Sequence, residues 1–234
     1  MSLSTVCDMH RLDIEQSLNA QGNAVLRSLL SVEQCQTIAA LYPDDACFRS
    51  RVVMGRHGFG RGEYKYFAYP LPAMIDRLRH ELYEDLVPIA NRWNRLMGVD
   101  NPYPATLDAF LDTCHRAGQK RPTSLLLQYG SADYNCLHQD LYGDHVFPLQ
   151  VAILLSRPGA DFTGGEFVMT EQGSHGQRAD IVDLHQGDAV VFAVNQRPVQ
   201  GAGRRIRKVA MRHGVSVVRS GSRHTVGLIF HDAR

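Results

Sequence analysis

Apolar residues recur at helical intervals in three segments of the first 120 residues. These segments are residues 31–42, 72–98 and 105–118. Ser31 and Gln34 open the first segment in the spacing of a capping box, and Gly118 ends the third. The second contains Pro88, where we expect the helix to bend. The pattern predicts a mainly helical N-terminal region.

After residue 122 the apolar positions fall in short runs rich in β-branched residues, separated by turns that contain glycine or proline. Seven runs have this character: residues 123–129, 146–156, 165–170, 180–184, 188–194, 208–218 and 223–230. Strands at this spacing without intervening helices are typical of a sandwich or a jelly roll. We therefore expect one domain, in which residues 1–121 form a helical layer with a substrate lid and residues 122–234 form a β core.

The composition is that of a soluble globular protein. The chain has 234 residues, of which 44% are hydrophobic and 21% charged, so it can bury a sizeable core. The net charge of +1 conceals a basic stretch from Arg204 to Arg223, which holds seven lysine and arginine residues and no acid. An anionic ligand and a solvated strand pair would each explain this stretch.

The cysteine pattern and the apolar runs bear on the location of the protein. The five cysteines, Cys7 among them, have no C-x-x-C spacing, which argues against a disulfide framework or a structural zinc. The first ten residues hold no apolar signal stretch, and no run approaches the roughly 18 apolar residues of a membrane span. We expect a cytoplasmic protein without a membrane partner.

Candidate chemistry begins in the segment "YNCLHQDLYG", where His138 and Asp140 stand two positions apart. On an extended chain such side chains share a face, so both can point into one cavity. An imidazole and a carboxylate, completed by a second histidine, form the three-residue site of non-haem Fe(II) oxygenases, which leaves coordination positions open for chemistry. The pair alone is weak evidence, because an exposed histidine beside an acid is common.

Three later histidines could complete the set, namely His213, His224 and His231. A Ser-Gly-Ser turn at 220–222 follows the strand of His213, and Arg223 begins the next strand. The arginine guanidinium would then reach a carboxylate held between the two strands, which its planar fork binds bidentately. His224 has an arginine at the same spacing but no turn before it, and His231 has none. We therefore predict His213 as the third ligand.

These residues resemble those of the 2-oxoglutarate/Fe(II)-dependent dioxygenase superfamily, particularly its prolyl-4-hydroxylase-like branch. The similarity covers about residues 122–232, where "LLLQYG", "VAILLS", "GGEF" and "GDAVVF" follow in the order of that branch. The resemblance implies a double-stranded β-helix, a jelly roll, with Fe(II) held by His138, Asp140 and His213. It implies further that Arg223 pairs with the distal carboxylate of 2-oxoglutarate.

The resemblance also suggests roles for two neighbours and a reaction. Tyr129 resembles the tyrosine that hydrogen-bonds the cosubstrate, although a core aromatic would look the same, and Thr225 is either a second partner of that carboxylate or a plain strand residue. The keto acid and O2 would occupy the open positions, and decarboxylation to succinate would drive oxidation of a C–H bond. Halogenating relatives lack the carboxylate of Asp140, so hydroxylation or demethylation is expected.

Residues 56–72 carry the clearest sign of a substrate. Residues 59–69 hold five of the eighteen phenylalanines and tyrosines, interleaved with basic residues. Such a segment could be a lid that stacks a nucleic-acid base, with Arg61, Lys65 and Tyr66 as candidate contacts. The alternative is a β-hairpin whose aromatics cover the helical layer.

The whole chain resembles a bacterial family of oxygenases suggested, by analogy with alkylated-base demethylases, to act on nucleic acids. A damaged nucleic-acid base is therefore one expected substrate. A peptidyl proline, a free amino acid or another small molecule is the alternative. A third hypothesis is a metal-binding β-helix that acts as a sensor without catalysis, against which the spacing of Arg223 argues.

Overall fold

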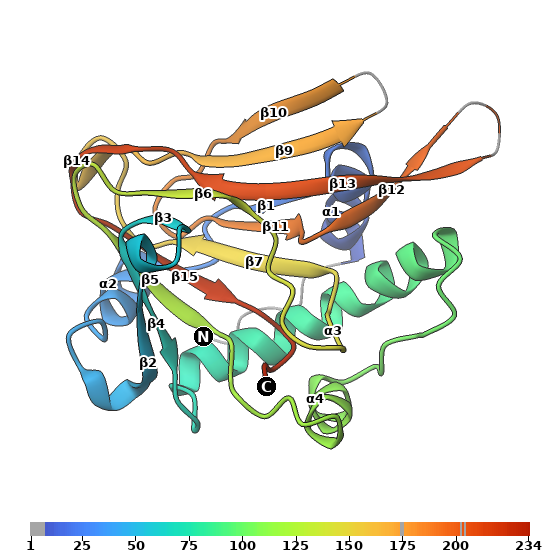
Figure 1. Ribbon diagram of the computed structural model, residues 1–234, viewed down its shortest axis with the longest axis horizontal. Helices are drawn as coiled ribbons and strands as arrows, with labels where there is room; N and C mark the ends of the chain where they lie inside the picture. The colour runs from blue at the N-terminus through green and yellow to red at the C-terminus, as the bar shows by residue number, and fades with distance from the viewer. Residues whose placement is uncertain (1–7, 174–175, 202, 204) are drawn as a thin grey trace.

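The computed structural model describes residues 8–173, 176–201, 203 and 205–234, so Cys7 and Arg204 lie outside the described residues. Two antiparallel sheets face each other (Figure 1). The larger has the strand order β1 (Asn23–Leu26), β11 (Ala189–Ala193), β7 (Leu149–Leu154), β15 (Arg223–Leu228), β5 (Leu125–Tyr129), β4 (Glu63–Phe67), β2 (Phe48–Val53). The fold is mainly β, as the pattern after residue 122 predicts.

The smaller sheet has the order β10 (Gly176–Val182), β9 (Phe167–Gly173), β13 (Ile206–Val215), β6 (Tyr134–His138), β3 (Gly60–Arg61). Strand β12 (Gln196–Gln200) pairs with β13, and β14 (Val218–Gly221) pairs with β8 (Phe162–Gly164). Each of the seven predicted runs contains a strand or part of one. The two sheets form the jelly-roll core that the sequence led us to expect.

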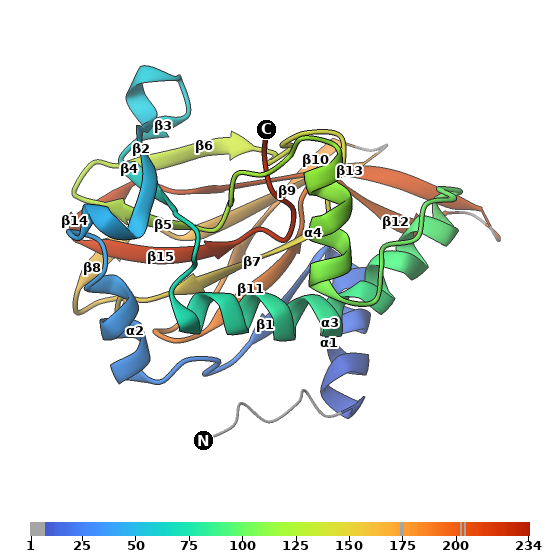
Figure 2. The same cartoon turned by 90° about the horizontal axis from the view of Figure 1, so that it is seen from below.

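Helices α1 (Asp8–Gln21), α2 (Val32–Ala39) and α3 (Ala73–Leu96) lie on the outer side of the larger sheet, and α4 (Leu107–Arg116) packs against α3. Of the two short 3-10 helices, η1 (Asp45–Cys47) precedes β2, whereas η2 (Met54–Arg56) lies beside β3 of the smaller sheet. Figure 2 shows α3 lying along the larger sheet. The predicted helices are confirmed, including the capping box in which Ser31 and Gln34 exchange hydrogen bonds. Helix α3 continues through Pro88.

A buried ion pair fastens α3 to the C-terminal segment. The Arg79 guanidinium lies 2.8 Å from the Asp232 carboxylate, and it also donates to the carbonyl groups of Ile229 and Phe230. Both charged side chains are almost fully buried, so removing one would leave the other uncompensated and destabilise the fold. The ion pair thus fixes the chain just beyond β15.

The region before residue 122 holds four α-helices, but it also contributes strands to both sheets. Strands β1, β2 and β4 extend the larger sheet, and β3 extends the smaller. Strand β4 pairs with β5, with Tyr64 opposite Leu127, so one sheet crosses the expected boundary at residue 121. These short strands are stabilised by ladders to distant parts of the chain, which local periodicity does not reveal. No helix among the described residues is long and apolar enough to cross a bilayer.

Candidate active site

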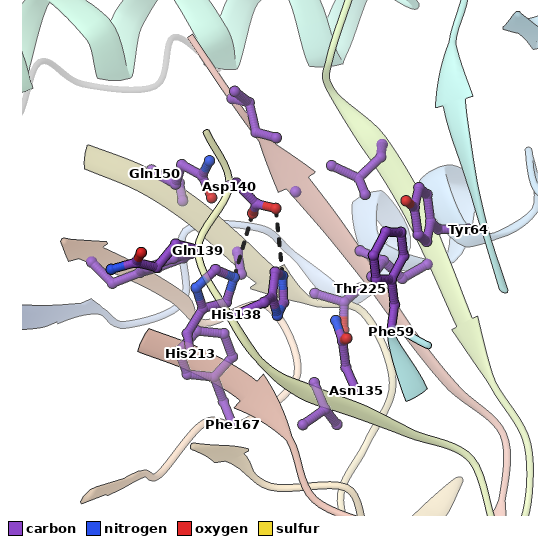
Figure 3. A pocket seen from close by; sticks show the side chains of 18 of the residues that line it. Phe59, Tyr64, Asn135, His138, Gln139, Asp140, Gln150, Phe167, His213 and Thr225 are labelled. Carbon is purple, nitrogen blue, oxygen red and sulfur yellow. Dashed lines mark ion pairs between the residues drawn. The ribbon is translucent and has the colours of Figure 1, made fainter. Parts of the chain in front are cut away.

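Three potential metal ligands meet at one end of the smaller sheet. His138 ends β6, Asp140 follows two residues later, and His213 lies directly opposite His138 in the ladder between β6 and β13. The two imidazole rings lie 4.2 Å apart between centroids, and one ligand atom of each of the three residues lies within 4.8 Å of the others. Figure 3 shows the three side chains converging. This arrangement is the one predicted from the sequence.

The Asp140 carboxylate lies between the two histidines. Its oxygens are each 3.4 Å from an Nε2 atom, one of His138 and one of His213. Burial opposes ionisation, but the interactions with the two neighbouring imidazoles outweigh it and hold the pKa of Asp140 well below its ordinary value. Nδ1 of His138 lies 2.8 Å from the carbonyl oxygen of Cys136, which can only accept, so Nε2 is left to bind a metal.

A chain of hydroxyl groups supports Asp140. The Tyr142 hydroxyl donates to Asp140 Oδ1 at 2.8 Å, and the Tyr66 hydroxyl donates to the Tyr142 oxygen at 3.3 Å. Gln139, between the two predicted ligands, donates its carboxamide to Asn195 and to the Met211 carbonyl, which ties the loop to β13. Sequence reasoning missed Tyr142, although its position two residues beyond Asp140 was a usable signal.

Arg223 begins β15 in the larger sheet, across the cavity from β13. The prediction that its strand neighbours that of His213 is therefore wrong, because the chain crosses from one side of the jelly roll to the other through β14, which pairs with β8 and contains Ser220 and Gly221 of the predicted turn. The Arg223 guanidinium still faces the cavity that the metal ligands line. Because the two sheets face each other, His213 and Arg223 line the same cavity although their strands are not neighbours.

The Arg223 side chain is a buried cation without an acidic partner among the described residues. It is 2% exposed, donates to the Thr225 hydroxyl at 2.6 Å, and has no partner for Nε. Burial lowers its pKa to about 10, so it stays charged at neutral pH. The hydroxyl of buried Tyr129, opposite Arg223 in the ladder, also has no partner. Unpaired buried groups are unfavourable, so this end of the cavity suits an anionic ligand.

One cavity of about 210 Å³ joins these groups. Every second residue along β15 lines this cavity, namely Arg223, Thr225 and Gly227, and Ile229 continues the line just beyond the end of the strand. At about 3.3 Å per residue this line is roughly 20 Å long, with the metal ligands on the facing wall. The rest of the wall is mostly apolar. The cavity thus has an anion-binding end at Arg223 and an opposite end at Ile229 and Gln150.

The candidate substrate residues are placed less favourably. Arg61 is exposed and its Nε lies 3.3 Å from an Asp133 oxygen. Lys65 is only 6% exposed, and its ammonium donates to the Tyr42 carbonyl and the Asp45 carboxylate. Tyr66 is buried behind Tyr142. Because β4 lies inside the larger sheet, its alternating side chains pack against neighbours, and the placement of Lys65 and Tyr66 does not fit direct substrate contact.

Phe59 belongs to the predicted lid segment, although it was not among the candidate substrate contacts. It lines the cavity, is 49% exposed, and stacks on His57 with the ring centroids 5.4 Å apart. The segment that carries it, between η2 and β3, is held to β6 where the Cys136 amide donates to the Phe59 carbonyl. Within the aromatic cluster at residues 59–69, Phe59 and Tyr64 are the residues that line the cavity.

The sequence of this chain is similar to that of an oxygenase family. Residues 62–233 match the model of the family Oxygenase-NA, described as an oxygenase catalysing oxidative methylation of damaged DNA. Two uncharacterized proteins, from two strains of Mycobacterium tuberculosis, are each 48% identical over 183 residues, which is 76% of this chain and 78% of theirs.

Solved structures share the fold. A prolyl-4-hydroxylase of Pseudomonas putida superposes with a TM-score of 0.57 at 13% identity, covering 96% of this chain and 99% of that one. An oxidoreductase of the 2OG-Fe(II) oxygenase family from Burkholderia pseudomallei gives 0.56 at 17% identity, covering 95% and 92%. At these identities the similarity concerns the fold alone.

Proposed function

The chain belongs to the Oxygenase-NA family and has the fold of 2-oxoglutarate/Fe(II) oxygenases, and we propose that it uses Fe(II), 2-oxoglutarate and O2 to oxidise a damaged nucleic-acid base. The observation that carries the proposal is the meeting of a His-Asp-His set with an unpaired buried arginine in one cavity. A structural metal site or a non-catalytic sensor would not need a buried arginine that can bind the carboxylate of a cosubstrate.

The residues present fit the proposed cofactor. Two imidazoles and one carboxylate suit Fe(II) and leave coordination positions open toward the cavity. Fe(II) held there would supply oxidation by O2, in which one oxygen atom would go into succinate as 2-oxoglutarate loses CO2 and the other would be inserted into a substrate C–H bond. Arg223 and Thr225 would bind the distal carboxylate, with Tyr129 beside it. The apolar walls would exclude water from the reacting groups.

The substrate proposal rests on the family description and on the cavity mouth. Phe59 offers an exposed ring at the entrance, and the exposed side chains of Arg56 and Arg61 lie on the same segment. An aromatic face with nearby cations suits a base extruded from a nucleic acid. On an N-methylated base, oxidation of the methyl group would give an unstable hemiaminal, which releases formaldehyde and the unmethylated base.

The test is formation of succinate on addition of Fe(II), ascorbate and 2-oxoglutarate, with and without single-stranded oligonucleotides that carry one N-methylated base. We expect the methylated strands to stimulate succinate formation with stoichiometric release of formaldehyde. Stimulation by proline-containing peptides or free amino acids instead would favour the alternative substrate class. Succinate absent under every condition would support the non-catalytic sensor. A cytoplasmic location remains a prediction that cell fractionation would check.

Replacing Phe59 with alanine should weaken binding of single-stranded oligonucleotides about ten- to a hundredfold, because stacking of a base on an aromatic ring contributes roughly 1–3 kcal/mol. Arg61→Ala should lower the logarithmic salt slope by about 0.7, the value for one phosphate contact on a single strand. Fluorescence anisotropy across a salt series measures both effects.

Lys65→Ala is the matched control for Arg61→Ala. It should leave the salt slope unchanged and lower the melting temperature, because Lys65 is buried and paired with Asp45. A loss of salt slope in the Lys65 variant equal to that in the Arg61 variant would contradict the placement of the two residues.

Tyr142→Phe should weaken metal binding roughly 10–100-fold, because the hydroxyl that orients Asp140 is lost while the ring is kept. Titration with Co(II), followed by its visible absorption, measures this without turnover. Tyr103→Phe is a control, since the Tyr103 hydroxyl donates only to the Val146 carbonyl. Equal metal affinities of the wild type and Tyr142→Phe would show that Asp140 needs no such support.

A further inference from the structure

A carboxamide without a partner lies at the end of the cavity opposite Arg223. Gln150 is the second residue of β7, and it faces Phe192 of β11 across the ladder. Cross-strand partners share a face, and the Phe192 ring contacts that of His213 at 4.5 Å. Gln150 therefore points into the cavity beside the metal ligands, and Figure 3 shows it on the other side of Asp140 from Phe59.

The burial of Gln150 makes its free amide informative. The residue is 3% exposed, and its Nε2 has no hydrogen-bond partner. Its neighbours in the cavity wall include Val151, Ala152 and Ile229, none of which has a polar side chain. A buried donor left unsatisfied lowers stability, so a residue of this kind is expected to serve a ligand.

The surroundings limit what this ligand can be. The charged and titratable groups that line the cavity are the metal ligands, Arg223 and three tyrosines, so Gln150 has no cation or anion of its own to assist it. A carboxamide presents one donor and one acceptor side by side. It therefore complements a neutral edge that has an acceptor next to a donor.

We infer that Gln150 is a specificity residue that binds the N7 and N6 positions of an adenine ring. Adenine has an acceptor at N7 beside a donor at N6, the pair that glutamine contacts bidentately, whereas guanine has two acceptors at N7 and O6 and pyrimidines have no N7. Contact through N6 and N7 leaves the N1 side of the ring free to face the metal ligands. This inference rests on the proposed function, because it presumes a nucleic-acid base as substrate.

The experiment compares wild type and Gln150→Leu on single-stranded oligonucleotides identical except at the target position. That position holds 1-methyladenine, 1-methyl-7-deazaadenine, 1-methylguanine, 3-methylcytosine or no base. Formaldehyde release gives kcat/KM, and anisotropy with Mn(II) in place of Fe(II) gives binding without turnover. The wild type should favour 1-methyladenine over 1-methylguanine about ten- to a hundredfold, the discrimination typical of a bidentate base contact.

Gln150→Leu should remove this preference, so that the ratio of kcat/KM on 1-methyladenine to kcat/KM on 1-methylguanine falls close to one. Replacement of N7 by CH should reduce the wild-type rate and affinity but have no effect in Gln150→Leu, since the contact is already lost. Gln172→Leu, which alters an exposed glutamine on β9, should behave as wild type. Without ligand, Gln150→Leu should melt at the same temperature as wild type or higher, because it removes an unsatisfied buried donor.

Any of the following results would contradict the inference, and each has a different meaning. A wild type without a preference for adenine, a preference that persists in Gln150→Leu, or sensitivity to N7 in that variant would contradict the role of Gln150 while the proposed function stands. A melting temperature several degrees lower would assign Gln150 to the fold. Succinate formation that no oligonucleotide stimulates would refute the proposed substrate class, and the adenine contact with it.

Discussion

Alanine in place of His213 should abolish the visible charge-transfer band that forms when Fe(II) and 2-oxoglutarate bind together without oxygen. We expect metal affinity to fall more than about a hundredfold, because loss of a partner that merely orients a ligand already lowers affinity roughly 10–100-fold. His138→Ala and Asp140→Ala should act in the same way, since the three side chains supply the ligand atoms that converge within 4.8 Å. Anaerobic absorption titration measures the effect.

His224→Ala is the control for this experiment. His224 lies next to Arg223 on β15, but its side chain is directed toward Tyr42, away from the cavity that Arg223 lines. The variant should keep the band. A normal band in His213→Ala together with its loss in His224→Ala would mean that the wrong histidine completes the site.

Arg223→Ala should raise the dissociation constant of 2-oxoglutarate about ten- to a hundredfold and leave metal binding in its absence largely intact. A charge-assisted bidentate contact contributes roughly 1.5–3 kcal/mol, and no acid among the described residues pairs with this guanidinium. Arg223→Lys should recover part of the affinity, because an ammonium supplies the charge without the planar fork. Calorimetric titration with Mn(II) in place of Fe(II) measures the binding.

Two further measurements separate a binding role from a structural one. Arg219→Ala, four residues earlier and exposed on β14, should leave 2-oxoglutarate affinity unchanged. Arg223→Leu should not lower the melting temperature of the ligand-free protein, because it removes an unpaired buried charge. Unchanged 2-oxoglutarate affinity in Arg223→Ala would mean that another basic residue holds the cosubstrate.

The metal ligands could be predicted from the sequence because the physics that places them is local. A strand has a period of two, so His138 and Asp140 had to share a face wherever the strand lay. The turn predicted at 220–222 was less accurate, because Ser220 and Gly221 belong to β14. The helices at 31–42, 72–98 and 105–118 followed from apolar periodicity and end signals in the same way.

Contacts between distant segments were decided by the tertiary structure alone. Strands β13 and β15 lie in opposite sheets, which the sequence between them does not indicate, and β4 pairs on one side with β5, from a segment far away in the chain. Lys65 and Tyr66 were misjudged for that reason. The composition of their segment suggested a lid, but the strand that carries them lies inside the larger sheet, and both side chains are buried. The periodicity of a strand indicates which of its side chains share a face. The order of the strands in the two sheets determines which residues that face packs against. The unpaired amide of Gln150 became visible only once that order was known.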